Sequence, residues 1–325
     1  GVLRMAELRK HPLTNDWVMI ASHRQNRPQM PKDWCPFCPG SGKVPDDFDV
    51  LEYDNDFPAL SQNPPVPDDV AAGLYKTAPC HGKCEVILYS KEHTVTLPEL
   101  PLPHVRKLVD LWCERHNIIS ADEKIKYVFI FENRGDVVGV TMPHPHGQIY
   151  GYPFIPKKLE LECASMKKHK KETGKCLICD MMETEISEKK RIIFENEDFV
   201  VFIPFFSAYP YGLYIVSKAH KQYITEFTER EKDNLAAAIK NAAGTLDSLF
   251  DYTFPYMMCM HQAPVNSGDV SDFHFHIEFY PPMRSRDKQK FNASSETGAW
   301  AHCNPTCPEE KAEELRAAYK KFTSK

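Results

Sequence analysis

Cysteines and histidines recur along the chain in two sets with the same order. Each set contains a Cys-x-x-Cys pair, the histidine of a Ser-Lys-x-His segment, and the first histidine of a His-x-His pair. Two thiolates from one tight turn and two imidazoles from distant segments are the ligands of a closed, tetrahedral zinc site. The sequence therefore predicts two zinc ions. The expected ligands are Cys35, Cys38, His93 and His144 for the first ion, and Cys176, Cys179, His220 and His274 for the second.

The spacing within the two sets indicates a duplication. His93 follows Cys38 by 55 residues, and His220 follows Cys179 by 41. The His-x-His pairs begin 51 residues after His93 and 54 residues after His220. Four landmarks in one order at similar spacing are typical of an internal repeat. The alternative is a collection of buried thiols and core histidines. That is our interpretation of the cysteine pairs without a second copy, Cys80/Cys84 and Cys303/Cys307.

The first His-x-His pair also indicates catalysis. Residues i and i+2 of a strand share a face, so His144, His146 and Gln148 are expected to project together. With His144 bound to zinc, His146 is held beside it, and an imidazole without a metal is a competent nucleophile toward phosphorus. Gln148 can donate a hydrogen bond to a phosphoryl oxygen. We therefore interpret His146 and Gln148 as catalytic candidates, with a structural histidine on a strand as the alternative.

These side chains need strands and helices to hold them. Apolar runs predict strands at 17–21, 85–89, 127–131, 192–194, 199–203, 213–216 and 273–280. Helical spacing predicts helices at 103–119, 159–171, 228–250 and 308–322. Thr228 and Glu231 form a capping box at the start of the third helix. A lysine-rich run at 166–175 favours a boundary between two halves, residues 1–165 and 166–325. We expect an α+β fold in which each half has an antiparallel sheet with packed helices.

Length and composition exclude several classes of protein. A chain of 325 residues exceeds what one core usually supports, which agrees with two halves. Apolar residues at 42% and charged residues at 26% exclude a disordered or fibrous chain. A net charge of −5 gives no basic bias toward nucleic acid or an acidic membrane surface. No apolar run reaches the ~20 residues of a membrane span. The first residues contain no apolar signal core, so we expect a cytoplasmic protein whose 11 cysteines are metal ligands or free thiols.

The segment around His146 resembles a known active-site motif. Asn133, Gly139 and the run His144-Pro145-His146-Gly147-Gln148 are similar to the active site of galactose-1-phosphate uridylyltransferases, a branch of the histidine triad superfamily. The resemblance covers most of the chain and includes Asp16-Trp17-Val18, Arg24, Arg27-Pro28, Asn55-Asp56-Phe57, His93, Thr96-Leu97-Pro98-Glu99-Leu100, Phe254-Pro255-Tyr256, His261, Ala263-Pro264 and Tyr280-Pro281-Pro282. It implies that the fold is a duplicated histidine-triad-like fold.

The resemblance implies an enzyme that exchanges UMP between UDP-glucose and galactose 1-phosphate in a ping-pong reaction. His146 matches the family's nucleophile. Gln148 matches its glutamine, at the place where histidine triad hydrolases carry a third histidine, and this favours a lasting uridylyl-histidine over its hydrolysis. The implied substrate contacts are Arg24 and Arg27 at the nucleotide phosphates, Asn55, Asp56 and Phe57 at uridine and ribose, Asn133 and Thr141 at the phosphates, and Lys290, Phe291 and Glu296 at the hexose.

Some of these assignments have alternatives. The two arginines could be solvated loop charges, Phe57 could be a core aromatic, and Lys290 and Glu296 could be an exposed pair. Thr141 stands where serine is expected, and Ser295 stands where tyrosine is typical. The preferred hexose is therefore left open.

For the second metal, the family offers two ligand sets. Some members hold iron or zinc with a glutamate and histidines, at positions that match Glu162, His261 and His276, although Glu278 replaces a further histidine. Other relatives use the cysteine set. We prefer the cysteine set because it repeats the first half and because thiolates favour zinc over harder cations.

Two rival functions stay open beside the uridylyltransferase. One is a nucleotide-sugar phosphorylase of the same fold, similar to ADP-glucose phosphorylase. The other is a nucleotide-binding zinc protein without turnover. The family also implies a homodimer, with UDP-glucose and a hexose 1-phosphate as its small-molecule partners.

Overall fold

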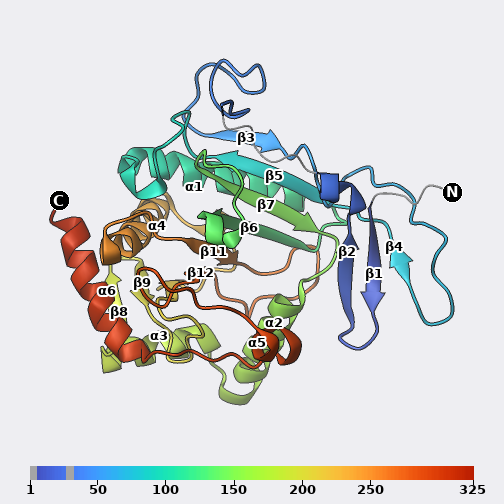
Figure 1. Ribbon diagram of the computed structural model, residues 1–325. Helices are drawn as coiled ribbons and strands as arrows, with labels where there is room; N and C mark the ends of the chain where they lie inside the picture. The colour runs from blue at the N-terminus through green and yellow to red at the C-terminus, as the bar shows by residue number, and fades with distance from the viewer. Residues whose placement is uncertain (1–5, 27–32) are drawn as a thin grey trace.

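The computed structural model describes residues 6–26 and 33–325. In these ranges a nine-stranded sheet forms the centre, a separate three-stranded sheet lies at one side of it, and helices pack on both faces of the larger sheet (Figure 1). The α+β class with antiparallel sheets and packed helices is therefore confirmed. Arg27, one of the two arginines predicted at the phosphates, lies outside the described residues.

Neighbouring strands of the large sheet are antiparallel throughout. Their order is β3 (Leu51–Asp54), β5 (Lys83–Leu88), β7 (His146–Tyr152), β6 (Tyr127–Arg134), β11 (Tyr256–His261), β12 (His276–Tyr280), β10 (Leu213–Ser217), β9 (Phe199–Phe202) and β8 (Ile192–Glu195). The small sheet has the order β2 (Asp16–Ile20), β1 (Glu7–His11) and β4 (Thr77–Ala78). It packs on the large sheet through Leu8 and Trp17, which join Tyr150 in one apolar cluster.

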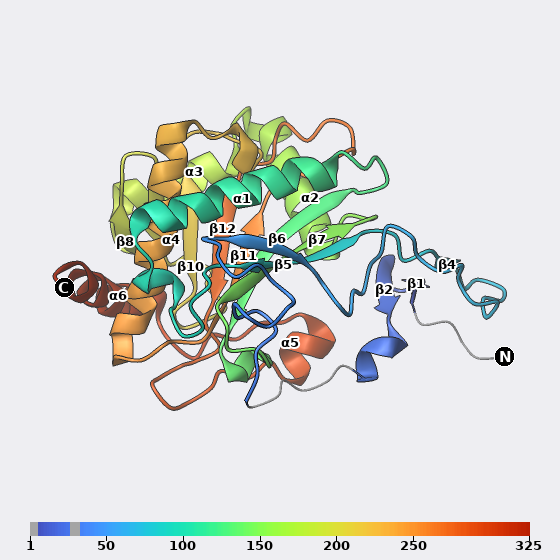
Figure 2. The same cartoon turned by 90° about the horizontal axis from the view of Figure 1, so that it is seen from above.

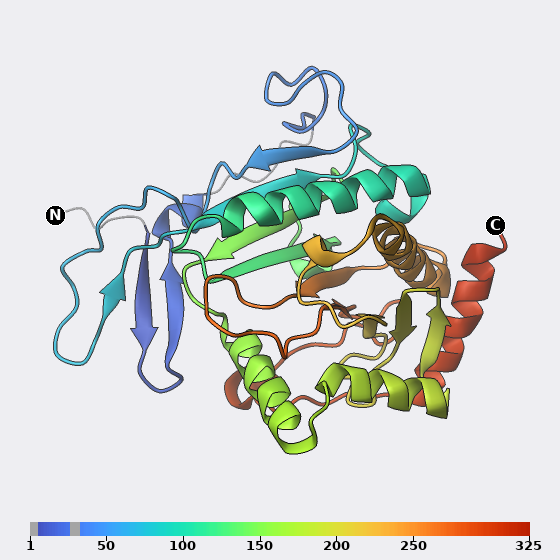
Figure 3. The same cartoon turned by 180° about the vertical axis from the view of Figure 1, so that it is seen from behind.

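The helices divide between the two faces of the large sheet. They are α1 (Leu102–Ser120), α2 (Lys157–Thr173), α3 (Leu177–Glu188), α4 (Glu229–Phe250), α5 (Ser294–Ala299) and α6 (Pro308–Thr323), with short 3-10 turns η1 (Ser22–Asn26), η2 (Leu97–Glu99), η3 (Asp136–Val138) and η4 (Ile224–Glu226). The main core lies between the sheet and the pair α1 and α4 (Figure 2). A second cluster joins α2 and α3 to the opposite face, and α6 lies beside β8 at the sheet edge (Figure 3). No helix in the described ranges is both long and apolar enough to cross a membrane.

Both halves of the chain contribute the same unit to the sheet. The first unit consists of β5, α1, β6 and β7, and the second consists of β10, α4, β11 and β12. Read from the outside toward the centre, their strands follow the same order, β5-β7-β6 and β10-β12-β11. The units meet where β6 pairs with β11, with Phe131 opposite Cys259 and Arg134 opposite Tyr256. The two halves therefore share one continuous sheet. The division into residues 1–165 and 166–325 stays a prediction, and its boundary falls within α2.

The core contains one carboxyl group of particular interest, Glu132 of β6. Its side chain is 4% exposed and accepts hydrogen bonds from the hydroxyls of Tyr89, at 3.1 Å, and Tyr256, at 3.2 Å. Burial raises the pKa of Glu132 from about 4.5 to about 7. The folded state therefore holds this proton more tightly than the unfolded chain does. The resulting stability is fully present below pH 4.5, shrinks above it, and is lost as the pH rises through about 7.

This titration predicts a stability difference for Glu132→Gln, which cannot ionise. Relative to wild type, the free energy of unfolding of the variant should rise by about 2–3 kcal/mol between pH 5 and pH 8.5. Urea denaturation at both pH values measures the difference. Glu114→Gln, at an exposed position of α1, is the matched control. A Glu132→Gln difference that is the same at both pH values would contradict the prediction.

Candidate active site and metal centres

The first predicted metal group comes together between the loop of Cys35 and Cys38 and the segments that follow β5 and precede β7. His144 lies two residues before β7 begins, so it is not part of the strand on which it was expected. The Cys38 thiol lies 3.3 Å from Nδ1 of His93 and 3.7 Å from Nδ1 of His144, and the Cys35 thiol lies 3.8 Å from Nδ1 of His144. All four ligand atoms lie within 4.8 Å of one another. Typical zinc–sulfur and zinc–nitrogen bonds in a tetrahedral site place sulfur and nitrogen about 3.6 Å apart. The donor set and its spacing therefore fit a closed zinc site.

The ring orientations in this group also suit a metal. Nε2 of His144 lies 2.7 Å from the carbonyl oxygen of Ser90, so it donates its hydrogen there and Nδ1 faces the thiols. Burial lowers the pKa of His144, which favours the neutral imidazole that binds metals. Burial, together with Cys35, raises the pKa of Cys38 to about 11. Because the metal-bound form is a thiolate, metal binding here would release protons.

The second cysteine group repeats this arrangement in the other half. The thiols of Cys176 and Cys179 lie 3.4 and 3.5 Å from Nδ1 of His274, and His220 completes the group within 4.8 Å. Nε2 of His274 lies 2.8 Å from the carbonyl oxygen of Ser217, which repeats the contact of Nε2 of His144 with the carbonyl oxygen of Ser90. The cysteine pair is held differently from the first, because Cys176 is the N-cap of α3 and Cys179 lies in its first turn. Both predicted cysteine sets thus form groups able to hold a metal ion.

The alternative ligands for the second metal form a separate, third group. Oε2 of Glu162 lies 2.8 Å from Nδ1 of His261, and Oε1 of Glu278 lies 3.0 Å from Nε2 of His276. Lys158 donates to the other oxygen of Glu278 at 2.6 Å. Although burial alone would raise it, the charges of His261, His276 and Lys158 hold the pKa of Glu278 well below its usual range. This group shares no residue with the cysteine set, and its donors already pair with one another and with Lys158.

His146, the predicted nucleophile, is oriented by its own strand. It begins β7, and its Nδ1 lies 2.7 Å from the carbonyl oxygen of His144. Nδ1 therefore carries the ring hydrogen, and Nε2 presents a lone pair. Phe37, between the two cysteines of the first group, is 3% exposed, and its ring lies 6.2 Å from the rings of both His144 and His146. The metal loop and the nucleophile are thus packed together, a contact that the sequence did not predict.

The face of β7 that carries His146 also carries Gln148 and Tyr150. The hydroxyl of Tyr150 lies 3.4 Å from Oε1 of Gln148, and the guanidinium of Arg24 lies 3.5 Å from the same hydroxyl. On β6, Phe131 pairs with Gln148, and continuing this register places Asn133 opposite His146. The structure therefore brings Arg24, Asn133, His146 and Gln148 to one surface. Tyr150 also lies on this surface and was not among the predicted site residues. The two-residue period of a strand, continued from His146 and Gln148, would have predicted it.

The predicted uridine contacts lie in the turn that follows β3. Oδ1 of Asn55 accepts a hydrogen bond from the backbone of Phe57 at 2.9 Å, and the Asp56 carboxylate accepts one from Tyr53 at 3.1 Å. The ring of His23, next to Arg24 in η1, lies 3.0 Å from the carbonyl oxygen of Pro58. This contact connects the turn to Arg24 and hence to the surface of β7. Phe57 is only half-buried, which does not suit the core alternative.

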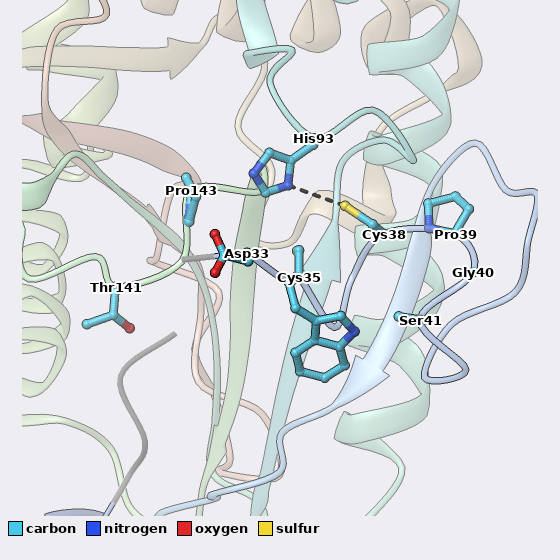
Figure 4. Close-up of a pocket in the computed structure, with 10 residues that line it drawn as sticks. Asp33, Cys35, Cys38, Pro39, Gly40, Ser41, His93, Thr141 and Pro143 are labelled. Carbon is cyan, nitrogen blue, oxygen red and sulfur yellow. Dashed lines mark hydrogen bonds between the residues drawn. The ribbon is translucent and has the colours of Figure 1, made fainter. Parts of the chain in front are cut away.

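A cleft of about 650 Å³ adjoins the first metal group. In Figure 4, Thr141 and Pro143 lie on one side of this cleft and Cys35, Cys38 and His93 on the other. Thr141 is exposed, five residues before His146. The cleft therefore offers space for a ligand between the segment that leads to the nucleophile and the metal loop.

The second half repeats the nucleophile's position with different chemistry. His276 corresponds to His146, and its Nδ1 lies 3.0 Å from the carbonyl oxygen of His274. Its Nε2, however, lies 3.0 Å from Glu278, which stands where the first half has Gln148. A carboxylate fixes that ring in an ion pair, whereas the neutral amide of Gln148 does not. The two equivalent histidines therefore differ in their surroundings, with a carboxylate beside His276 and an amide two residues after His146.

Two of the three predicted hexose contacts, Lys290 and Glu296, pair with each other in the second half. Lys290 is 7% exposed and donates to Asn292 at 3.2 Å and to Glu296 at 3.4 Å, while its ammonium lies 5.4 Å from the ring of Tyr209. Phe291, by contrast, is 72% exposed. Lys290 and Glu296 are thus a partly buried pair rather than an exposed one. Their role at the hexose stays a prediction.

Comparison with known proteins gives consistent matches over almost the whole chain. The family models for galactose-1-phosphate uridyl transferase match residues 3–156 with the N-terminal domain and residues 162–321 with the C-terminal domain. A galactose-1-phosphate uridylyltransferase from Thermotoga maritima is 44% identical over 314 residues, covering 96% of this chain and 98% of the relative. One from Haemophilus influenzae is 30% identical over 328 residues, covering 95% and 93%.

Solved structures agree with these sequence matches. A uridylyltransferase structure is similar with a TM-score of 0.90 at 32% identity, covering 97% of this chain and 99% of that one. An ADP-glucose phosphorylase from Arabidopsis thaliana, with bound ADP-glucose, has a TM-score of 0.74 at 24% identity, covering 96% and 98%. The second likeness shows a common fold.

Proposed function

The chain belongs to the galactose-1-phosphate uridylyltransferase family, and from that membership we propose that it exchanges UMP between UDP-glucose and galactose 1-phosphate through a uridylyl group carried on His146. The chain is accordingly a transferase. The observation that carries the proposal is the hydrogen bond from Nδ1 of His146 to the carbonyl of His144, because it places the ring hydrogen on Nδ1, and the lone pair of the neutral imidazole is then on Nε2.

The proposed reaction has two displacements at one phosphorus. In the first, the Nε2 lone pair of His146 forms a bond to the α-phosphorus of UDP-glucose, and the bond to the bridging oxygen breaks. Glucose 1-phosphate leaves with that electron pair. In the second, a phosphate oxygen of galactose 1-phosphate attacks the same phosphorus, and the electron pair of the P–N bond returns to Nε2. One nucleotide site therefore serves both steps.

The surrounding side chains suit this charge distribution. Arg24 carries a cation to the face of β7, and the amide of Gln148 can donate to a phosphoryl oxygen next to the reacting ring. Asn133, opposite His146 in the continued register, and Thr141, which lines the adjoining cleft, add neutral polar groups. In the proposal the turn of Asn55, Asp56 and Phe57 receives the uridine and its ribose.

Zinc bound to the two cysteine groups would supply structural support, since four protein ligands leave no open coordination position. His144 links this support to the reaction, because its ring belongs to the metal group and its carbonyl holds His146. Iron in the group of Glu162, His261 and His276 is the alternative for the second ion. The homodimer and the hexose role of Lys290, Phe291 and Glu296 remain predictions from family membership, and the cytoplasmic location remains a prediction from the sequence.

Incubation with UDP-glucose or ADP-glucose, followed by intact-mass measurement, tests the proposal. We expect the mass of one uridylyl group to be added with UDP-glucose, and we expect galactose 1-phosphate to remove it. Addition of an adenylyl group from ADP-glucose alone would indicate the phosphorylase instead. No added mass with either donor would favour a nucleotide-binding zinc protein without turnover.

A further inference from the structure

Tyr89, which follows β5, contacts the segment that contains His146. Its ring lies on the face of the sheet that α1 covers. Its backbone N–H donates to the carbonyl of Pro145 at 3.0 Å, between the two histidines of the motif. Its side chain is 1% exposed, and its ring packs edge-on against Trp112 of α1. Its own carbonyl accepts a hydrogen bond from His104 at 2.7 Å. The residue is therefore fixed at both its backbone and its ring.

The hydroxyl of Tyr89 ends directly under Gly147. A Cβ atom added to Gly147 would lie 2.4 Å from this hydroxyl and 3.0 Å from the carbonyl oxygen of Phe131. Since Gly147 lies between His146 and Gln148, the hydroxyl supports the strand where its opposite face carries both catalytic candidates. Close approach of the two segments requires glycine here.

Glu132 in turn holds the hydroxyl of Tyr89. Its carboxyl group receives the hydroxyls of Tyr89 and of Tyr256, and both tyrosines are almost fully buried. The two hydroxyls have the same partner but different neighbours. Tyr256 lies on β11 under the guanidinium of Arg134, 4.1 Å from its ring centre, whereas Tyr89 reaches Gly147.

We propose that Tyr89, held by Glu132, is a positioning residue. It sets the position and orientation of the His146 ring by supporting Gly147 from the opposite face of the sheet. This inference rests on the proposed function of His146. It assigns a role in the reaction to a pair of residues in the core that cannot touch the substrate.

The test compares Tyr89→Phe with Tyr256→Phe, because each removes one buried hydroxyl from the same carboxyl group. At saturating UDP-glucose, Tyr89→Phe should slow transfer of the uridylyl group to His146 about tenfold in a single turnover. The donor concentration for half-maximal rate should stay within about twofold, because no donor contact is removed. Tyr256→Phe should keep the wild-type rate within about twofold. Metal content and unfolding are measured for both variants.

A double-mutant cycle adds a second readout. Gly147→Ala should slow transfer by about 100-fold in the wild-type background, but by clearly less when Tyr89→Phe has removed the closest atom. Equal slowing by the two phenylalanine variants, or a strictly additive cycle, would overturn the inference. If wild-type protein takes up no nucleotide, the proposed function fails instead. In that case, coupling between positions 89 and 147 in the free energy of unfolding still decides whether Tyr89 bears on Gly147.

Discussion

Replacing His146 with alanine is expected to lower the rate of UMP exchange by about 10³-fold or more, because the variant has no atom that can carry the uridylyl group between the two displacements. Intact-mass measurement after incubation with UDP-glucose should show no added group. Since His146 is half-buried at the start of β7 and lies outside the metal groups, the variant should fold and keep its metal content.

The control for this result is His11→Ala, which removes an imidazole from β1 of the small sheet. This variant should exchange UMP at the wild-type rate. Retention of exchange by His146→Ala would remove the nucleophile from the mechanism. If wild-type protein exchanged UMP but never showed the added mass of a uridylyl group, direct transfer between the two sugar phosphates would be indicated instead.

The second large effect is expected at the metal groups. Cys35→Ser and Cys176→Ser should each reduce the bound metal from two ions to one per chain, as measured by elemental analysis of the purified protein. Each should also lose several kcal/mol of stability, because the metal joins segments that are far apart in the sequence. Cys35→Ser should slow UMP exchange as well, since the carbonyl that orients His146 belongs to a ligand of that group.

Cys303→Ser, which changes an exposed thiol outside both groups, is the matched control. It should leave the metal content and the stability unchanged. If two ions remain after Cys176→Ser, the second ion belongs to the group of Glu162, His261 and His276 rather than to the cysteine set.

The sequence predicted the parts of the site that depend on residue type and short spacing. Cysteine and histidine are rare enough that two matched sets of four indicate two groups, and the groups form as expected. The two-residue period of a strand places His146 and Gln148 on one face without knowledge of the partner strand. The capping box of Thr228 and Glu231 correctly predicts where α4 begins.

The sequence did not predict features that depend on contacts between distant segments. Pairing of β6 with β11 is set by packing of both halves, and neither strand carries a local signal for its neighbour. The contact of Phe37 with His146 and that of Tyr89 with Gly147 have the same origin. The helix α3 was missed because Cys176 and Cys179 indicate a metal turn, whereas here the same pair also caps a helix.

The pairing of β6 with β11 has a consequence for turnover. Main-chain hydrogen bonds cross the junction, and Arg134 at its end donates to the carbonyl of Phe254 at 3.0 Å and to the carboxylate of Asp247 in α4. A hinge motion that separated the two halves would break all of these bonds at once. Its free-energy cost would exceed what thermal fluctuations supply during catalysis. In the proposed reaction, one sugar nucleotide therefore enters and the other leaves without separation of the two halves.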